Sequence, residues 1–199
     1  MTTLQGLKDE AASCTRCDLY ARATQIVFGE GRPGASIMLL GEQPGDQEDK
    51  QGHPFVGPAG RLLDRALEEA GINRSDVYVT NAVKHFKWTE RGKRRIHQRP
   101  NTGEIKACGY WLDAELGAVR PRLVVLLGAV AGEAMFGSRF RVGEHRGKAE
   151  EAAFGTWRGV VVGTIHPSAV LRGPDQESRD RAYAGLVEDL VVAREAVPR

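Results

Sequence analysis

Few cysteines, little net charge and no long hydrophobic run characterise this 199-residue sequence. Its three cysteines are an odd number, and in a reducing compartment they point away from disulfides and toward a metal site or a reactive thiol. A net charge of +2 gives no general affinity for polyanions, so any basic surface must be local. No apolar run is long enough to span a membrane, and the start MTTLQGLKDE lacks the basic and apolar regions of a signal peptide. We therefore expect a cytoplasmic protein without a membrane partner, and nothing in the sequence implies a protein partner.

Hydrophobic residues make up 41% of the chain, enough for the core of one domain over residues 1–199. Apolar runs at residues 36–40, 77–80, 123–127 and 160–164 predict buried strands. Segments of helical period follow the first and third of these runs. Strands that alternate with helices are typical of an α/β fold built on a parallel sheet.

The loop predicted over residues 39–60 contains the densest group of special residues. It follows a strand, and ligands of open α/β sheets bind beyond the carboxyl ends of strands. Glycines such as Gly41 let the backbone approach a bound group closely. Carboxylates, an amide and an aromatic ring add chemistry: Glu42, Asp46, Glu48, Asp49, Gln43 and Phe55. A solvated connector would not need a phenylalanine at this place, so we interpret the loop as a site. It is not a phosphate cradle of a known type, because it lacks a Gly-Lys-Ser/Thr ending and a GxGxxG pattern.

The motif Cys14-x-x-Cys17 is a weak signal on its own, since it fits a redox pair, two half-buried thiols or half of a metal site. Cys108 lies far away in sequence, on a predicted helix. His85, just after the strand at 77–80, is the preferred fourth ligand. Zinc readily accepts three cysteines and one histidine, and an iron–sulfur cluster tolerates histidine. Separate buried residues are the alternative.

Two polar residues are expected at the ends of core strands, beside the loop. Asn81 follows the strand at 77–80, and its amide offers one donor and one acceptor to a base edge. His166 follows the strand at 160–164 and is held by the rigid Pro167. An asparagine often satisfies nearby backbone instead, so Asn81 is informative only together with the loop.

Residues 84–99 form a local basic segment, KHFKWTERGKRRIHQR, with seven lysines or arginines against one acidic residue. Phe86 and Trp88 lie among the charges, a combination suited to a nucleic-acid backbone and its bases. A solvated charged hairpin would have a similar composition. His97 comes soon after three consecutive cations, which disfavour the imidazolium and favour the neutral form that a nucleophile or base requires.

Over essentially the whole chain, these motifs resemble the uracil-DNA glycosylase superfamily. The resemblance rests on the GEQPGDQED loop with PFVGPAG after it, on TN at residues 80–81, on HPS at residues 166–168, and on the cysteine framework of the iron–sulfur, family 4-like class. The run KRRIH at residues 93–97 resembles the insertion of the X-type members, which cross-link themselves to DNA. The resemblance implies a three-layer α/β/α sandwich with a central four-stranded parallel sheet. It also implies uracil-containing DNA as the partner, with single-stranded DNA favoured.

The resemblance implies how uracil would be read and released. The nucleotide must leave the base stack, because the glycosidic bond is unreachable inside a duplex. Phe55 would stack on the flipped uracil and Asn81 would read its polar edge. His166 would hydrogen-bond the negative charge that builds on the departing base while the sugar becomes oxocarbenium-like. The substrate-binding residues implied in this way are Gly41, Asp46, Phe55, Asn81 and Ser168.

The chain also departs from the superfamily pattern. Where other members carry a water-activating aspartate, this chain has Gln43, which cannot be a general base. Similarity to the X-type members then implies that His97 attacks the sugar C1′, that Glu42 orients the imidazole or takes its proton, and that Arg95 supports the loop. Because an alkylated imidazole is a poor leaving group, the enzyme would stay attached after one turnover. Gly45 stands where other members block thymine with a tyrosine, so discrimination must come from elsewhere.

By the same resemblance, His85 occupies a place where iron–sulfur relatives carry cysteine. This supports a [4Fe-4S] cluster on Cys14, Cys17, His85 and Cys108, with zinc as the alternative. Two other functions are open at this point. One is a conventional glycosylase that turns over repeatedly and whose basic segment only clamps phosphates. The other is a non-enzymatic, metal-stabilised DNA-binding protein.

Overall fold

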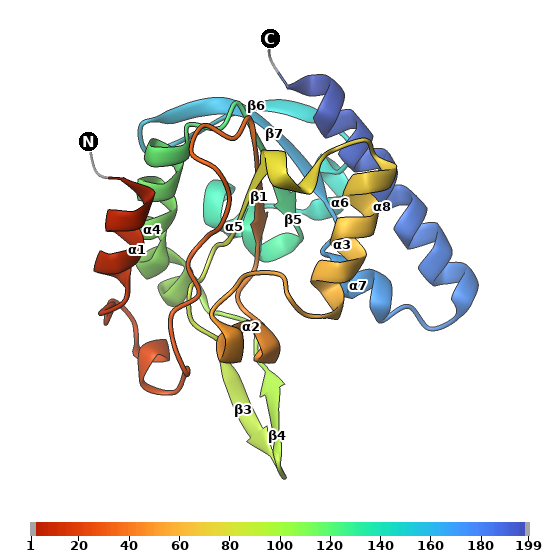
Figure 1. Cartoon of the computed structure of the whole chain (residues 1–199). Helices are drawn as coiled ribbons and strands as arrows, with labels where there is room; N and C mark the ends of the chain where they lie inside the picture. The colour runs from red at the N-terminus through yellow and green to blue at the C-terminus, as the bar shows by residue number, and fades with distance from the viewer. Residues whose placement is uncertain (1–2, 198–199) are drawn as a thin grey trace.

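A five-stranded sheet forms the centre of the computed structural model, with helices on both faces (Figure 1). The strand order is β2-β1-β5-β7-β6, in which the first four strands are parallel and β6 is antiparallel to β7. The predicted four-stranded parallel sheet is confirmed, and β6 adds an edge strand. The structure describes residues 3–197, so residues 1–2 and 198–199 of the expected domain lie outside it. The strands are Ile37–Gly41 (β1), Val77–Asn81 (β2), Trp88–Arg91 (β3), Arg94–His97 (β4), Leu123–Leu127 (β5), Ala149–Phe154 (β6) and Trp157–Thr164 (β7).

The helices form one layer on each face of the sheet (Figure 1). One layer contains α4 and α5, with α1 packed on α4, and the other contains α3, α7 and α8. This is the three-layer sandwich that the resemblance implies. The helices are Leu4–Ala11 (α1), Asp46–Gln51 (α2), Pro58–Glu69 (α3), Thr102–Val119 (α4), Ala129–Phe136 (α5), Val142–His145 (α6), Pro167–Leu171 (α7) and Gln176–Ala196 (α8), with short 3₁₀ turns at Asp18–Ala21 (η1) and Arg74–Asp76 (η2).

The central strands are apolar because both faces of the sheet are covered. Met38 and Leu40 face the layer of α4 and α5, whereas Ile37 and Leu39 face α3 and α8. Each such side chain, once removed from water, contributes about 1.5–3 kcal/mol. Among residues 3–197, no helix combines the length and apolar character that crossing a membrane requires. The packed layers fix the carboxyl ends of β1, β2 and β7 relative to one another.

The two edge strands of the sheet, β2 and β6, differ in what lies along their outer sides. At the β2 edge, Glu30 and Val79 exchange two backbone hydrogen bonds of 2.8 Å, so the segment before β1 lies along this strand. At the other edge, β6 carries the charged residues Glu150 and Glu151. The N-terminal segment therefore closes one side of the sheet.

The sequence predicted a loop over the whole segment between β1 and α3, but the structure differs. The segment contains the helix α2, whose first turn carries Asp46, Glu48 and Asp49, where acidic side chains interact well with the helix dipole. Gly52 ends this helix in a left-handed conformation (φ 77°). A helix of six mostly charged residues has no apolar period, which explains why the sequence pattern did not predict it. Glu48 and Asp49 are buried.

The basic segment forms an antiparallel hairpin, β3 and β4, that projects from the body of the protein (Figure 1). Gly92 and Lys93 connect the strands, and Gly92 has the positive φ (61°) that suits a two-residue turn. Trp88 pairs with His97 at the end next to the body. The solvated charged hairpin, which was the alternative interpretation of the basic segment, is therefore present, and His97 lies at its base.

Candidate active site

A cavity of about 540 Å³ lies at the carboxyl ends of β1, β2 and β7. Gly41 and Asn81, the last residues of β1 and β2, are partners in the parallel register, so the segments that follow them begin at the same edge. The residues that line the cavity are Glu42, Gln43, Gly45, Glu48, Phe55, Ala59, Asn81, His97, Arg99, His166, Ser168 and Arg172. Segments distant in sequence thus converge on one pocket that contains most of the expected site residues.

Gly41, Phe55 and Asn81 pack closely at one wall of the cavity. A side chain at position 41 would collide with Oδ1 of Asn81 and with the ring of Phe55, so only glycine fits there. Phe55 has a positive φ of 58°, which for a bulky residue costs on the order of 1–3 kcal/mol. Its ring centroid lies 6.2 Å from that of His166, with an angle of 29° between the planes. The packing therefore presents an aromatic face beside an amide.

His166 is held by Ser168, its neighbour in the HPS motif. Nδ1 of His166 accepts a hydrogen bond from the backbone N–H of Ser168 (3.1 Å) and lies 2.8 Å from the Ser168 hydroxyl. Burial lowers the pKa of His166 to about 4; the Glu42 carboxylate opposes this shift, and Arg172 and His97 add to it. A neutral imidazole whose Nδ1 accepts carries its proton on Nε2. At neutral pH, His166 is therefore an uncharged Nε2–H donor at the cavity.

His97 reaches the same cavity from the hairpin. Its Nε2 lies 3.2 Å from Oε1 of Glu42; the His97 side chain is 49% exposed and that of Glu42 is 23% exposed. Oε1 of Glu42 is itself buried and makes no well-directed hydrogen bond within residues 3–197. The ring of Phe86 lies 6.2 Å from the His97 ring. A carboxylate oxygen with free acceptor capacity next to an imidazole can orient the ring or accept its proton.

The side chain of Gln43 joins the two ends of the hairpin. Its Nε2 donates to the carbonyl oxygens of Lys87 (3.2 Å) and Gln98 (3.0 Å), and its Oε1 accepts from the backbone N–H of Lys87 (3.0 Å). Lys87 precedes β3 and Gln98 follows β4. A carboxylate at position 43 would face two carbonyl oxygens without a proton to donate. The amide is thus required by the hairpin.

Arg95 connects the hairpin to α2. Its Nε lies 2.6 Å from Oδ1 of Asp46, and its Nη1 lies 2.6 Å from Oδ2 of the buried Asp49. The hydrogen bond from Lys50, together with Arg95, lowers the pKa of Asp46. Asp46 is not among the residues that line the cavity, and the expectation that it contacts substrate stays a prediction. Its carboxylate is occupied by Arg95 and Lys50.

The sequence suggested that the two aromatic residues of the basic segment could stack on bases, and they differ in how far this is possible. Phe86 is 1% exposed, so the interpretation as a stacking platform is wrong for this residue. Trp88 is half-buried. Its ring centroid lies 4.5 Å from the guanidinium carbon of Arg22 and 5.4 Å from that of Arg95, and its Nε1 donates to the Arg22 carbonyl (3.0 Å). For Trp88, stacking on bases stays a prediction.

Two cations at the cavity were not singled out from the sequence. Arg99 forms an ion pair with Glu133 (2.8 Å), and Nη1 of Arg172 donates to the Ser168 hydroxyl (3.1 Å). Arg99 is two residues beyond His97, and Arg172 comes shortly after the HPS motif. Both arginines could have been predicted from their closeness in sequence to His97 and His166.

Three of the four expected metal ligands are neighbours. Hydrogen bonds from Cys108 and from His85 lower the pKa of the Cys17 thiol to about 5. The hydrogen bond to Cys17, together with burial, raises the pKa of Cys108. Sγ of Cys14 accepts a hydrogen bond from Nε1 of Trp111 (3.1 Å). These contacts bring together the segment before η1, the segment after β2, and α4.

Cysteine and histidine are side chains of the types that bind metals. Within the described chain, however, no group of three or more His, Cys, Asp or Glu side chains is arranged to hold a metal ion. A thiol with a lowered pKa is readily available as the thiolate that metals bind. His85 is 5% exposed, and its Nδ1 is buried without a hydrogen-bond partner among residues 3–197. An unsatisfied imidazole nitrogen beside two thiols fits a ligand role.

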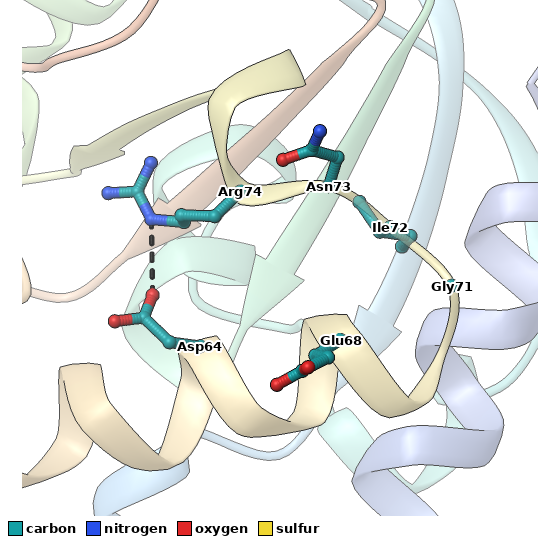
Figure 2. Close-up of a pocket in the computed structure, with 6 residues that line it drawn as sticks. All are labelled: Asp64, Glu68, Gly71, Ile72, Asn73 and Arg74. Carbon is teal, nitrogen blue, oxygen red and sulfur yellow. Dashed lines mark hydrogen bonds and ion pairs between the residues drawn. The ribbon is translucent and has the colours of Figure 1, made fainter.

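A second hollow, of about 460 Å³, lies between α3 and η2 (Figure 2). Figure 2 shows Asp64 and Arg74 pointing toward one another across it, joined by an ion pair of 3.2 Å. Because η2 directly precedes β2, this hollow is at the amino-terminal end of the sheet, away from the histidines. Its lining is Asp64, Glu68, Gly71, Ile72, Asn73 and Arg74. It takes no part in the site.

Comparison with known proteins identifies the family. The model of the uracil DNA glycosylase superfamily matches residues 28–191, and the chain belongs to this superfamily. It is similar to the Type-4 uracil-DNA glycosylase of Sulfurisphaera tokodaii, with 37% identity over 180 residues that cover 88% of this chain and 79% of that protein. The Type-4 uracil-DNA glycosylase of Thermotoga maritima is 37% identical over 176 residues, covering 87% and 85%. A Type-5 uracil-DNA glycosylase of Thermus thermophilus is 34% identical over 142 residues, covering 60% and 61%.

Proposed function

We propose that this protein is a uracil-DNA glycosylase that excises uracil from DNA and is then captured as a covalent adduct between His97 and the deoxyribose C1′. Membership of the superfamily and the names of the relatives support the glycosylase activity. The observation that carries the covalent step is the meeting of His97 and Glu42 at the cavity, 3.2 Å apart. Gln43 supports it further, because its amide is engaged with the hairpin and has no basic function.

In this proposal, a flipped uracil occupies the cavity. The Phe55 ring offers a stacking face, and the Asn81 amide can both donate to and accept from the polar edge of the base. Extrusion from a single strand requires no unpairing, which favours single-stranded DNA as the substrate.

The glycosidic bond breaks with its electron pair moving to N1 of uracil, and the sugar becomes oxocarbenium-like. The Nε2–H of neutral His166 stabilises the negative charge on the departing base by a hydrogen bond. A donor that is uncharged and fixed by Ser168 needs no rearrangement as this charge appears.

The ring nitrogen of His97 that holds a lone pair then forms the bond to C1′. The alkylated ring keeps its other proton and gains a positive charge, which the adjacent Glu42 carboxylate offsets by pairing with it or by accepting that proton. Uracil leaves as the anion and takes a proton from water. An alkylated imidazole leaves the sugar poorly, so one protein molecule is consumed for each uracil.

The main alternative is a conventional glycosylase that turns over repeatedly. The names of several relatives, Type-4 uracil-DNA glycosylase, support this alternative as well as they support the covalent one. In that case the hairpin only binds DNA, and water takes the place of His97 at C1′. A DNA-binding protein without chemistry is the less favoured reading, because it gives no role to the neutral donor His166.

We also propose a [4Fe-4S] cluster held by Cys14, Cys17, His85 and Cys108, with zinc as the alternative. The lowered pKa of Cys17 and the unpartnered Nδ1 of His85 support this proposal. When bound, such a cluster would supply a structural link between the N-terminal segment and α4. Metal analysis tests it: iron with broad absorption near ~400 nm that bleaches on reduction is expected, and a colourless zinc protein would contradict it.

The test of the function uses a single-stranded oligonucleotide with one uracil, run on a denaturing gel beside a thymine control. A heat-stable shifted band in stoichiometric yield, seen only with uracil, is the expected result. Uracil released in excess over protein without a shifted band would select the conventional glycosylase. Tight binding with the base intact would select the DNA-binding protein.

A further inference from the structure

A buried ion pair lies directly behind the strand end that carries Asn81. The side chains of Lys84 and Glu115 are both 0% exposed, and Nζ of Lys84 lies 2.5 Å from Oε2 of Glu115. Neither residue lines the cavity. Removing two charges from water is unfavourable enough that a well-packed hydrophobic pair is often as stable, so stability alone is a weak reason for this pair.

The ammonium group of Lys84 has an acceptor for each of its three protons. Besides Glu115, it donates to Oγ1 of Thr80 (2.7 Å) and to the backbone carbonyl oxygen of Asn81 (2.6 Å). The side chain of Lys84 thus folds back over the chain and binds the backbone of the residue three positions before it.

The carboxylate of Glu115 holds this ammonium group in place. It accepts hydrogen bonds from the Tyr78 hydroxyl (2.9 Å), from the Thr80 hydroxyl (2.9 and 3.0 Å) and from the backbone N–H of Gly29 (3.0 Å). Burial, and next the charge of Glu115, raises the pKa of Tyr78, so its hydroxyl stays protonated and donates. The network is therefore anchored in α4, in β2 and in the segment before β1.

We propose that Lys84 is a positioning residue for base recognition, because its ammonium group fixes the backbone of Asn81 and hence the direction in which the Asn81 amide enters the cavity. Ala82 and Val83, the two residues after Asn81, are held by the end of β1 and the residue that follows it. The N–H groups of Ala82 and Val83 donate to the carbonyl oxygens of Gly41 (2.9 Å) and Glu42 (3.0 Å). This inference rests on the proposed function for the identity of the base and adds a residue that acts without touching it.

The test uses the full chain with the double substitution Lys84→Met and Glu115→Gln. The single change Lys84→Met would leave a buried, unpaired carboxylate and could prevent folding. In the double variant both charges are gone, and the amide oxygen at position 115 still accepts from Tyr78 and Gly29, while its NH₂ group donates to Thr80. Only the carbonyl of Asn81 loses its donor. The matched control is Leu116→Ala, which removes a fully buried side chain from the same helix without touching Asn81.

The first measurement is the dissociation constant for a single-stranded oligonucleotide that contains 2′-fluoro-2′-deoxyuridine, compared with thymidine at the same position. The fluorine disfavours the oxocarbenium-like sugar, so the base stays attached during the measurement. In the double variant we expect the preference for the uracil analogue to fall by about tenfold or more, while Leu116→Ala keeps the preference of the natural protein. An unchanged preference in the double variant, or an equal loss in Leu116→Ala, would overturn the proposal.

The second measurement is amide hydrogen exchange, which does not depend on the identity of the ligand. The proposal predicts faster exchange at Ala82 and Val83 in the double variant, with β5 and β7 unchanged. Unchanged exchange at these two amides would refute the positioning role. If the natural protein showed no preference for the uracil analogue, the proposed function would fail, and the exchange measurement would still decide whether Lys84 fixes this segment.

Discussion

The two histidines of the cavity, His166 and His97, come from regions of opposite character. His166 caps the helix α7 at the end of a buried strand, and Ser168 and burial keep it neutral, with a pKa of about 4. His97 lies at the base of a projecting hairpin, half exposed, and is held beside Glu42. The same side chain therefore serves as a fixed donor in one region and as an accessible nitrogen in the other. A donor to a developing charge benefits from rigidity, whereas a group that must form a bond needs room to approach.

The substitution His97→Ser removes the accessible histidine of the pair and should have the largest effect. We expect complete loss of the heat-stable adduct, because the proposal assigns the attack on C1′ to the His97 imidazole. The measurement is the denaturing gel with uracil-containing single strands. The matched control is His145→Ser, since His145 also pairs with a glutamate, Glu150 at 2.7 Å, but on an element outside the cavity lining. An adduct that persists in His97→Ser would rule out His97 as the attacking group.

Loosening the hairpin from α2 should have the next largest effect. In Arg95→Gln the ion pairs to Asp46 and Asp49 are lost, and we expect adduct formation to slow by about 100-fold, since small misplacements of a reacting group cost rates of this order. The adjacent Arg94→Gln changes an exposed cation and is the control. Single-turnover rates from quenched gel samples give the comparison. Equal rates for the two variants would show that the tie to α2 does not position His97.

A smaller effect is expected from Gln43→Met, which removes three hydrogen bonds from the base of the hairpin while keeping a side chain of similar length. Each such bond contributes on the order of 1 kcal/mol net. Because only the part of this loss that displaces His97 affects the rate, we expect adduct formation to slow by about tenfold, with faster amide exchange in β3 and β4. Gln98→Ala is a useful control, because it removes a nearby side chain whose hydrogen bonds within residues 3–197 go to the Thr89 hydroxyl and the His97 carbonyl. A faster reaction in Gln43→Met would mean that the hydrogen bonds of Gln43 restrain His97 instead of positioning it for attack.

The last prediction concerns the stability of the fold instead of the reaction rate, and it follows from the pKa of His166. Its pKa in the folded protein is about 4, below the ordinary value of 6.5, so the unfolded chain binds more protons between these values. The free energy of unfolding should therefore fall as the pH decreases from about 6.5 to about 4, by on the order of 2 kcal/mol from this residue. Urea denaturation at several pH values, compared between the natural protein and His166→Asn, isolates the contribution. Parallel pH dependences would contradict the assignment of a neutral His166 in the folded protein.

Much of the fold could be predicted from the sequence because its cause is local. The runs at 36–40 and 123–127 are apolar since both faces of a parallel sheet are covered. Such burial produces consecutive apolar residues, which can be recognised directly in the sequence. The places of Asn81 and His166 at strand ends follow from the same pattern. The family, too, could be identified from short motifs.

What the sequence did not predict depends on contacts between distant residues. Asp46 bonds to Arg95, which is 49 positions further along the chain. Phe86 was expected to stack on bases, but it is buried, and no local pattern indicates that its faces are covered. The amide of Gln43 acquires its role only when Lys87 and Gln98 come together beside it.

The closed edge of the central sheet has a consequence for self-association. An open edge strand is a template on which a second copy can pair, the first step toward aggregates. Here the exchange of hydrogen bonds between Glu30 and Val79 occupies the outer side of β2, and Glu150 and Glu151 place negative charges on β6. The proposed covalent capture would consume one protein molecule for each uracil, so the protein would have to be present in proportion to the lesions it meets. Protection of both edges against pairing would let such a protein reach the required concentration without aggregating through its sheet edges.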